Sequence, residues 1–171
     1  MASALPIPGL NPGTRFGDAA AAAVEVRSRE VFAQAGRVLD TSDIEGVHDM
    51  RVATRRLRAA LEVFAACFPK KEHRDLLHEV KALADALGER RDPDVAIAAL
   101  EKVAAGLTAA DQPGIDSLAG ELRAGQTHAN ERLGEALEHV DAARLEQRLL
   151  ALAGSARRTE PSTPVEDGIP G

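Results

Sequence analysis

Small side chains make up much of the apolar part of this chain and restrict the folds open to it. Thirty-three of the 171 residues are alanine, whereas tryptophan and tyrosine are absent and phenylalanine occurs four times. Alanine has the highest helix propensity, and strands favour β-branched and aromatic residues. Apolar residues recur at spacings of three and four, and no segment alternates convincingly with the period of a strand. The sequence therefore predicts an all-α protein of closely packed helices.

Six helices are expected, at about residues 18–39, 47–68, 70–87, 92–103, 115–139 and 142–153. Gly88 is expected to end the third helix, because glycine is favoured just after a helix. Asp92 and Pro93 are expected to begin the fourth, as N-cap and first helical residue. Pro69 separates the second helix from the third by a short turn, so these two should pack antiparallel.

The two ends of the chain differ in composition from the middle. Residues 1–16 and 155–171 are rich in proline, glycine and small or polar residues, so we expect a mobile N-terminal tail and a disordered C-terminal tail. Residues 17–154 remain as one helical bundle of about five to six antiparallel helices. A chain of this length is long enough to bury a core.

The second predicted helix carries a strip of basic side chains. Four of them follow one another at spacings of three, four and three: His48, Arg51, Arg55 and Arg58. These spacings place them on one helix face over about 15 Å. Like charges so placed repel one another, and a polyanion lying along the strip would explain the arrangement. The alternatives are a solvated face neutralised by Glu62 and neighbouring acids and, for His48, a bond to a neighbour at the helix entry.

The third predicted helix carries a second basic line. It contains Arg74, His78 and Lys81, but Asp85 lies on it too, so alone it would be an ordinary surface. If both lines flank the seam between antiparallel helices, their side chains form one basic groove. Arginine and lysine hold phosphate oxygens by charge-assisted hydrogen bonds, arginine in bidentate fashion.

Two short motifs resemble those of a known family. The first is H-x-x-R-V-x-x-R-R-L-R, from His48 to Arg58, and the second is G-x-x-R-D-x-D-V, from Gly88 to Val95. Together, roughly thirty residues apart, they resemble the CHAD family, the conserved histidine α-helical domain.

The resemblance implies non-catalytic binding of inorganic polyphosphate by basic side chains. Carried onto this chain, it implicates His48, Arg51, Arg55, Arg56, Arg58, Lys81 and Arg91. Arg74 and His78 are added from their place on the second basic line. Arg56 points about 100° away from the strip, so a role in the fold is the alternative. For Arg91 two roles carry equal weight: reaching the ligand, or pairing with Asp92 to orient a turn.

Members of this family usually contain two helical bundles related by a pseudo-two-fold axis. The resemblance here covers about residues 18–153, which correspond to the first bundle alone. Half a ligand surface implies weak binding, so we expect two copies to form a symmetric homodimer that restores the two-bundle arrangement.

Other functions have less support in the sequence. No nucleophile with a base, paired carboxylate site or metal cluster is evident, so we expect neither an enzyme nor a cofactor. The first alternative is a histidine phosphotransfer module carrying phosphate on His48. The additional arginines, and Val52 where such modules favour glycine, argue against it. The second alternative is a structural helical scaffold without ligand.

Charge and composition also bear on partners and compartment. The net charge is −6, and from residue 111 onward eleven acids face six bases, so the basic charge is local. Nucleic acid is an unlikely partner, because the chain lacks aromatic platforms for stacking bases. The single cysteine, Cys67, excludes an internal disulfide. No apolar run approaches about 18 residues. We therefore expect no membrane association and a cytoplasmic location, with polyphosphate granules as a further location that the ligand implies.

Overall fold

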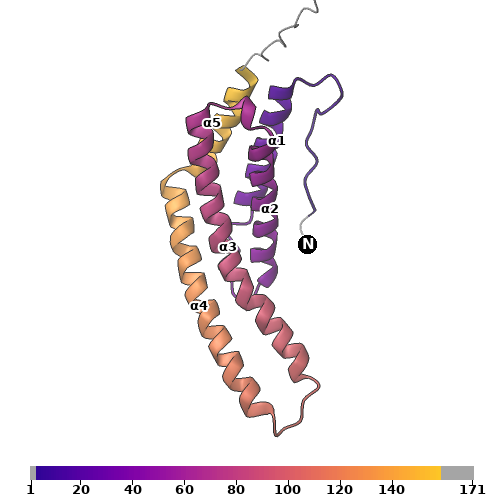
Figure 1. Cartoon of the computed structure of the whole chain (residues 1–171), viewed down its shortest axis with the longest axis vertical. Coiled ribbons are helices and arrows are strands. Elements are labelled where there is room, and N and C mark those ends of the chain that lie inside the picture. The colour runs from indigo at the N-terminus through magenta and orange to yellow at the C-terminus, as the bar shows by residue number, and fades with distance from the viewer. Residues whose placement is uncertain (1–2, 159–171) are drawn as a thin grey trace, which may run out of the picture.

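The described part of the chain, residues 3–158 of the computed structural model, is built entirely from helices (Figure 1). The elements are α1 (Phe16–Phe32), α2 (Ile44–Val63), the short 3-10 helix η1 (Ala65–Cys67), α3 (Lys70–Ala104), α4 (Gln112–Ala142) and α5 (Leu145–Arg158). No strand occurs within residues 3–158. The prediction of an all-α bundle of five to six helices is confirmed.

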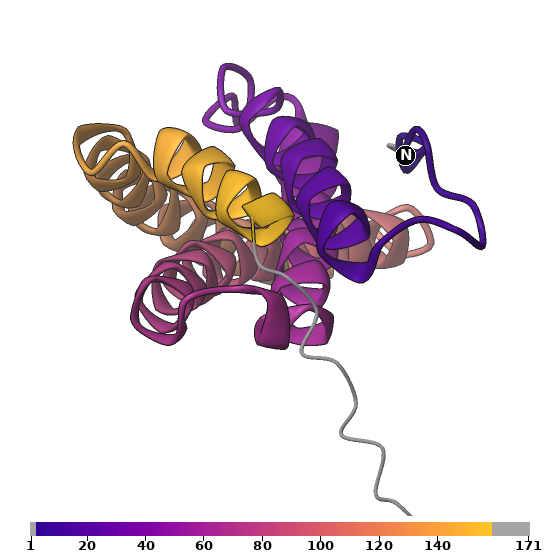
Figure 2. The ribbon, with the colours of Figure 1, turned by 90° about the horizontal axis from the view of Figure 1, so that it is seen from above.

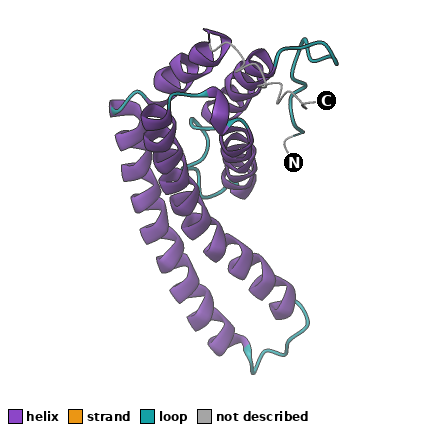
Figure 3. Cartoon of the chain, turned by 45° about the horizontal axis from the view of Figure 1, so that its top comes forward, coloured by secondary structure: helices purple, strands orange, loops and turns teal. Residues whose placement is uncertain are grey.

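The helices form a bundle at one end of the molecule and a two-helix extension at the other. α1 packs against α2 and α5, while α3 packs against α2 and α4. Seen from above, α5 lies between α1 and α4 (Figure 2). The far ends of α3 and α4 extend beyond the other helices (Figure 3). We call this extension, residues 99–122, the two-helix arm.

Leucine and smaller apolar residues fill the core of the bundle. Fully buried members come from all five α-helices and include Val24, Val31, Met50, Leu57, Leu61, Leu87, Leu133 and Leu149. The apolar core cluster takes no residue from the range 88–132. The arm therefore lies outside the region that the core stabilises.

Helix α2 begins where a capping residue and a close backbone approach coincide. Asp43 caps the helix by accepting a hydrogen bond from the Gly46 N–H, and Arg37 donates to Asp43 at 2.6 Å. A Cβ on Gly46 would lie 3.1 Å from the carbonyl oxygen of Arg37, so glycine permits this approach. Helix α1 ends at Phe32 rather than near residue 39, and turns follow it, although Val38 is still buried.

The predicted break between residues 88 and 92 is wrong. Helix α3 runs without interruption for 35 residues, with Gly88 and Pro93 both inside it. Pro93 lacks the N–H that a helix would direct to the residue four positions earlier. The inward stripe nevertheless continues through this region, since Leu87, Arg90 and Asp94 are all buried. Arg90 donates to Asp94 across the turn that contains Pro93, and this i,i+4 ion pair holds the turn helical.

The boundaries of the bundle also differ from those expected. Helix α5 continues to Arg158, so residues 155–158 are helical rather than part of a tail. The rest of the expected C-terminal tail, residues 159–171, lies outside the described residues. At the other end, residues 3–15 contain no helix, but the backbone of Leu5 is attached to α1: its N–H donates to Glu30 at 2.5 Å, and its carbonyl accepts from Arg27 at 3.1 Å.

Candidate anion-binding surface

The basic strip of α2 faces away from the core of the bundle. Arg51, Arg55 and Arg58 are exposed and His48 is half-buried, whereas Met50, Leu57 and Leu61 on the opposite side are fully buried. The local periodicity of α2 thus separates a core face from a basic face, as the sequence predicts.

Two arginines of the strip have no countercharge in the part of the chain that the structure describes. Arg51 and Arg55 form no ion pair and no side-chain hydrogen bond with the described residues, and the same is true of His48. The alternative of a face neutralised by neighbouring acids therefore holds only at one end of the strip, at Arg58. The guanidinium groups of Arg51 and Arg55 are exposed to solvent.

One acid, Glu62, pairs with the strip at its C-terminal end. The Nε of Arg58 donates to the Oε1 of Glu62 at 3.1 Å, and the Nζ of Lys81 lies 3.4 Å from the same oxygen. The hydrogen bond from Arg58, followed by the one from Lys81, lowers the pKa of Glu62. Lys81 belongs to α3, so Glu62 joins the basic strip of α2 to the next helix.

Contacts at two levels show that α2 and α3 lie antiparallel along a common seam. Near the end of α2, Glu62 meets Lys81 in the first half of α3, whereas at the start of α2 the Ile44 carbonyl accepts from Arg91 at 3.4 Å. Figure 1 shows the same arrangement of the two helices. Lys81 is therefore the residue of α3 that the structure brings to the strip.

Arg74 and His78 belong to α3 but, unlike Lys81, are not paired with Glu62. Both are exposed, and Arg74, whose side chain is 76% exposed, pairs with its neighbour Asp75 at 3.6 Å. Arg74 precedes Lys81 by seven residues, about 10 Å along the helix. The Nε2 of His73 lies 2.8 Å from the carbonyl oxygen of Leu61. Because the two helices are antiparallel, Arg74 and His78, which follow His73, lie beside the last turns of α2. Neither of them forms an ion pair or a hydrogen bond with the strip.

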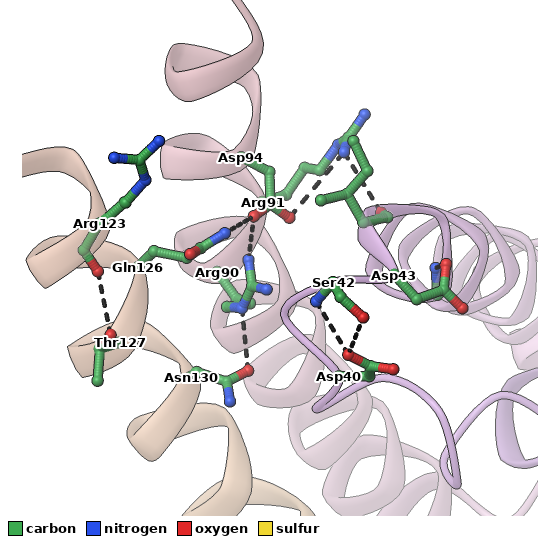
Figure 4. Close-up of polar contacts among 12 residues, drawn as sticks. Asp40, Ser42, Asp43, Arg90, Arg91, Asp94, Arg123, Gln126, Thr127 and Asn130 are labelled. Atoms are coloured by element: carbon green, nitrogen blue, oxygen red, sulfur yellow. Dashed lines mark hydrogen bonds and ion pairs between the residues drawn. The ribbon is translucent and has the colours of Figure 1, made fainter. Parts of the chain in front are cut away.

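Arg91 does not form the expected pair with Asp92. Its Nη1 donates to the carbonyl of Ile44 and lies 4.0 Å from Asp94 Oδ2, and its side chain is only 20% exposed (Figure 4). The expected pairing with Asp92 is wrong, because the guanidinium of Arg91 is directed to the Ile44 carbonyl and Asp94 instead. Arg91 thus links α3 to the start of α2.

The second sequence motif forms a buried polar network, which the sequence analysis did not anticipate. The side chains of Arg90 and Asp94 are fully buried and paired, Arg90 Nε donates to Asn130 at 2.9 Å, and Gln126 donates to Asp94 at 2.7 Å (Figure 4). Asn130 in turn donates to the carbonyl of Leu39 at 3.1 Å. The network therefore connects α3, α4 and the loop after α1. The sequence contained one signal for this network. Arg90 and Asp94 follow the apolar Leu87 by three and seven residues, which places them on the same helix face.

Arg56 does not share the strip. It is half-buried and lies about 140° from Arg51 by the helical period. Its position agrees with the alternative of a role in the fold.

Among residues 3–158 no group of three or more His, Cys, Asp or Glu side chains is placed to hold a metal ion. Of the helices in these residues, none combines the length and the apolar character that crossing a bilayer requires. A cavity of about 680 Å³ lies where the end of α1 meets α4 and α5, and it is lined mainly by apolar residues, among them Phe32, Leu39 and Leu137.

The fold and this surface define an all-helical domain with a local basic strip, in which Arg51 and Arg55 form no ion pair with the described residues. A family model described as CHAD domain matches residues 22–170, past the residue 153 at which the resemblance was expected to end. The chain therefore belongs to the CHAD domain family, a family associated in general with polyphosphate binding. Comparisons with curated proteins and with solved structures gave no match.

Proposed function

We propose that this protein binds inorganic polyphosphate without catalysis, through the basic surface that α2 and α3 present. The observation that carries the proposal is that, within residues 3–158, no countercharge lies at Arg51 and Arg55, two exposed arginines one helical turn apart. An exposed cationic strip of this kind is unfavourable for the helix by itself, and an anionic chain relieves the repulsion.

The expected contributions of the basic residues differ. Arg51 and Arg55 contact the chain directly by charge-assisted hydrogen bonds, with His48 at the entrance of the helix and Arg58 at the far end. Lys81 contributes from α3, and Arg74 and His78 on the same helix add further contacts for longer chains. Arg56 and Arg91 serve the fold, because one lies on another side of α2 and the other is bound to a backbone carbonyl.

The remainder of the protein supports a preference for polyphosphate over nucleic acid. The net charge is −6, so attraction comes from the strip and not from the molecule as a whole. Aromatic residues make up 2% of the chain, which leaves few platforms for stacking bases. A cytoplasmic location, at polyphosphate granules in particular, follows from this proposal as a further expectation.

A titration tests the proposal. The purified protein is titrated with long-chain polyphosphate and, in parallel, with DNA of equal phosphate content at physiological salt. Selective polyphosphate binding that weakens in the variants R51A and R55A, but not in R123A, supports it. Arg123 is a matched control because it is an exposed arginine that belongs to another helix, α4, and not to the strip. A wild-type protein that binds neither ligand, or both equally, contradicts it.

We further propose that two copies pair as a homodimer. The support is the two-helix arm, in which Val103, Leu107 and Leu118 are exposed and which lies outside the core cluster. Light scattering at micromolar concentration should give a dimer mass, and L118D should reduce it to that of a monomer. A wild-type monomer that binds polyphosphate tightly would refute the pairing.

The two alternatives predict different results in the same assays. A phosphotransfer module would form phosphohistidine on His48 when given a phosphoryl donor, and H48Q would abolish the labelling. Under our proposal H48Q retains most of its polyphosphate affinity, because the arginines carry the binding. A structural scaffold would show no affinity for any polyanion.

A further inference from the structure

Glu62 stands at the next helical position of the basic strip, four residues after Arg58. It is an acid in a line of bases, and its carboxylate does not point away from them. A single oxygen, Oε1, lies 3.1 Å from Arg58 Nε and 3.4 Å from Lys81 Nζ. These two cations come from two different helices, and the carboxylate lies between them.

Arg58 and Lys81 would bind an anionic oxygen of a ligand in the same way as they bind the Glu62 carboxylate. A phosphate oxygen accepts from arginine and lysine at similar distances. Glu62 therefore occupies the donors that a bound phosphate would use, and its charge repels a phosphate that approaches them. Arg51 and Arg55, in contrast, have no such competitor among the described residues.

The ion pairs that Glu62 makes are open to displacement. The side chains of Arg58, Glu62 and Lys81 are 45%, 42% and 43% exposed, and exposed ion pairs contribute little to stability because water and salt screen them. Arg58 and Lys81 also lower the pKa of Glu62, so the carboxylate remains charged at neutral pH. Only a competing anion, and not a proton, removes it under ordinary conditions.

We infer that Glu62 is an internal competing anion at one end of the polyphosphate site, which a bound chain must displace before it reaches Arg58 and Lys81. This inference rests on the proposed function. Glu62 thereby determines affinity and length preference. A short polyphosphate binds at Arg51 and Arg55 and leaves Glu62 in place, whereas a long chain, held by several contacts at once, displaces it.

The variant E62Q tests the inference, with E131Q as a matched control. Both changes remove one negative charge at an exposed position, but Glu131 lies on α4, where His128 is its neighbour at 3.7 Å. Affinities for long-chain polyphosphate and for tripolyphosphate are measured across a series of salt concentrations. Circular dichroism confirms that each variant is folded.

We expect E62Q to bind the long chain about fivefold or more tightly than wild type, with a steeper dependence on salt because additional phosphate contacts form. Tripolyphosphate affinity should change less than twofold, as should both affinities of E131Q. The variant K81A should have a small effect in the wild-type background and a larger one in E62Q, because Lys81 then contacts the ligand. This non-additivity is the readout that a purely structural role would not produce.

The outcomes separate the inference from the function on which it rests. If E62Q binds no tighter than wild type while R55A loses affinity, the competing-anion role is refuted and the proposed function stands. Equal gains for E62Q and E131Q also refute it, because net charge then explains the effect. If neither wild type nor E62Q binds polyphosphate, the proposed function fails and the inference fails with it.

Discussion

Among the ion pairs of the described residues, breaking the buried pair of Arg90 and Asp94 should lower the free energy of unfolding the most. Both side chains are fully buried, and Asp94 also accepts from Gln126 at 2.7 Å. Replacing Asp94 by alanine leaves the guanidinium in the interior without its countercharge. Breaking a buried pair in this way costs about 3–5 kcal/mol.

This cost is large relative to the total stability of the protein. Domains usually unfold with a free energy of about 5–15 kcal/mol, so D94A removes a substantial share. For a domain of this size, each kcal/mol corresponds to a shift in Tm of about 2–4 °C, which gives a decrease of about 6–20 °C for D94A. Urea unfolding followed by far-UV circular dichroism measures the free energy, and a thermal scan measures Tm.

Two further variants identify the cause. D92A removes the same charge from an exposed position two residues earlier on α3, and it should change stability by less than about 0.5 kcal/mol. The double variant R90M/D94L replaces the pair by apolar side chains and should recover most of the loss, because no charge is then buried alone. A cost below about 1 kcal/mol for D94A, equal to that of D92A, would refute this account of the second motif.

Three other predictions concern the strip, the pH dependence of stability and the cysteine. R55A should weaken polyphosphate binding about fivefold with unchanged helicity, as an exposed contact of about 1 kcal/mol implies. R56A should change the affinity less than twofold. Equal losses of affinity in the two variants would refute the assignment of binding to one face of α2. The hydrogen bond from Arg37 lowers the pKa of Asp43, so this carboxylate stabilises the fold above its unfolded pKa of about 4. The stabilisation is lost as the pH falls through the lower folded pKa. The free energy of unfolding measured in urea should therefore decrease below about pH 4, and it should decrease less in D43A. Burial raises the pKa of the Cys67 thiol, so a disulfide reagent at pH 8 should modify the native protein at least about tenfold more slowly than the protein in urea; comparable rates would show that the thiol is accessible.

Local sequence signals predicted the helices but not all of their ends. Gly88 and Pro93 are ordinary signals for the end and start of a helix, yet α3 passes through both. The reason is that packing against α4 and the buried pair of Arg90 and Asp94 outweigh the local preference of two residues. Such contacts join residues far apart in the sequence, so no local pattern contains them.

The basic strip was determined by the sequence alone. Residues three and four apart share a face in any α-helix, so the relation among Arg51, Arg55 and Arg58 needs no tertiary information. The short turn at Pro69 likewise implied that the third helix returns beside the second. The family membership also followed from motifs that are read directly from the sequence.

Only the tertiary structure decided which of these charges are free. In the folded protein, Glu62 forms ion pairs with Arg58 and Lys81, and Arg91 donates to a backbone carbonyl at the start of α2. Arg90 is buried in an ion pair with Asp94. Each of these outcomes depends on how helices cross and which side chains meet across the seam. Helical periodicity fixes the direction of a side chain from its own axis, but its partners, its burial and hence its availability to a ligand come from the neighbouring helices.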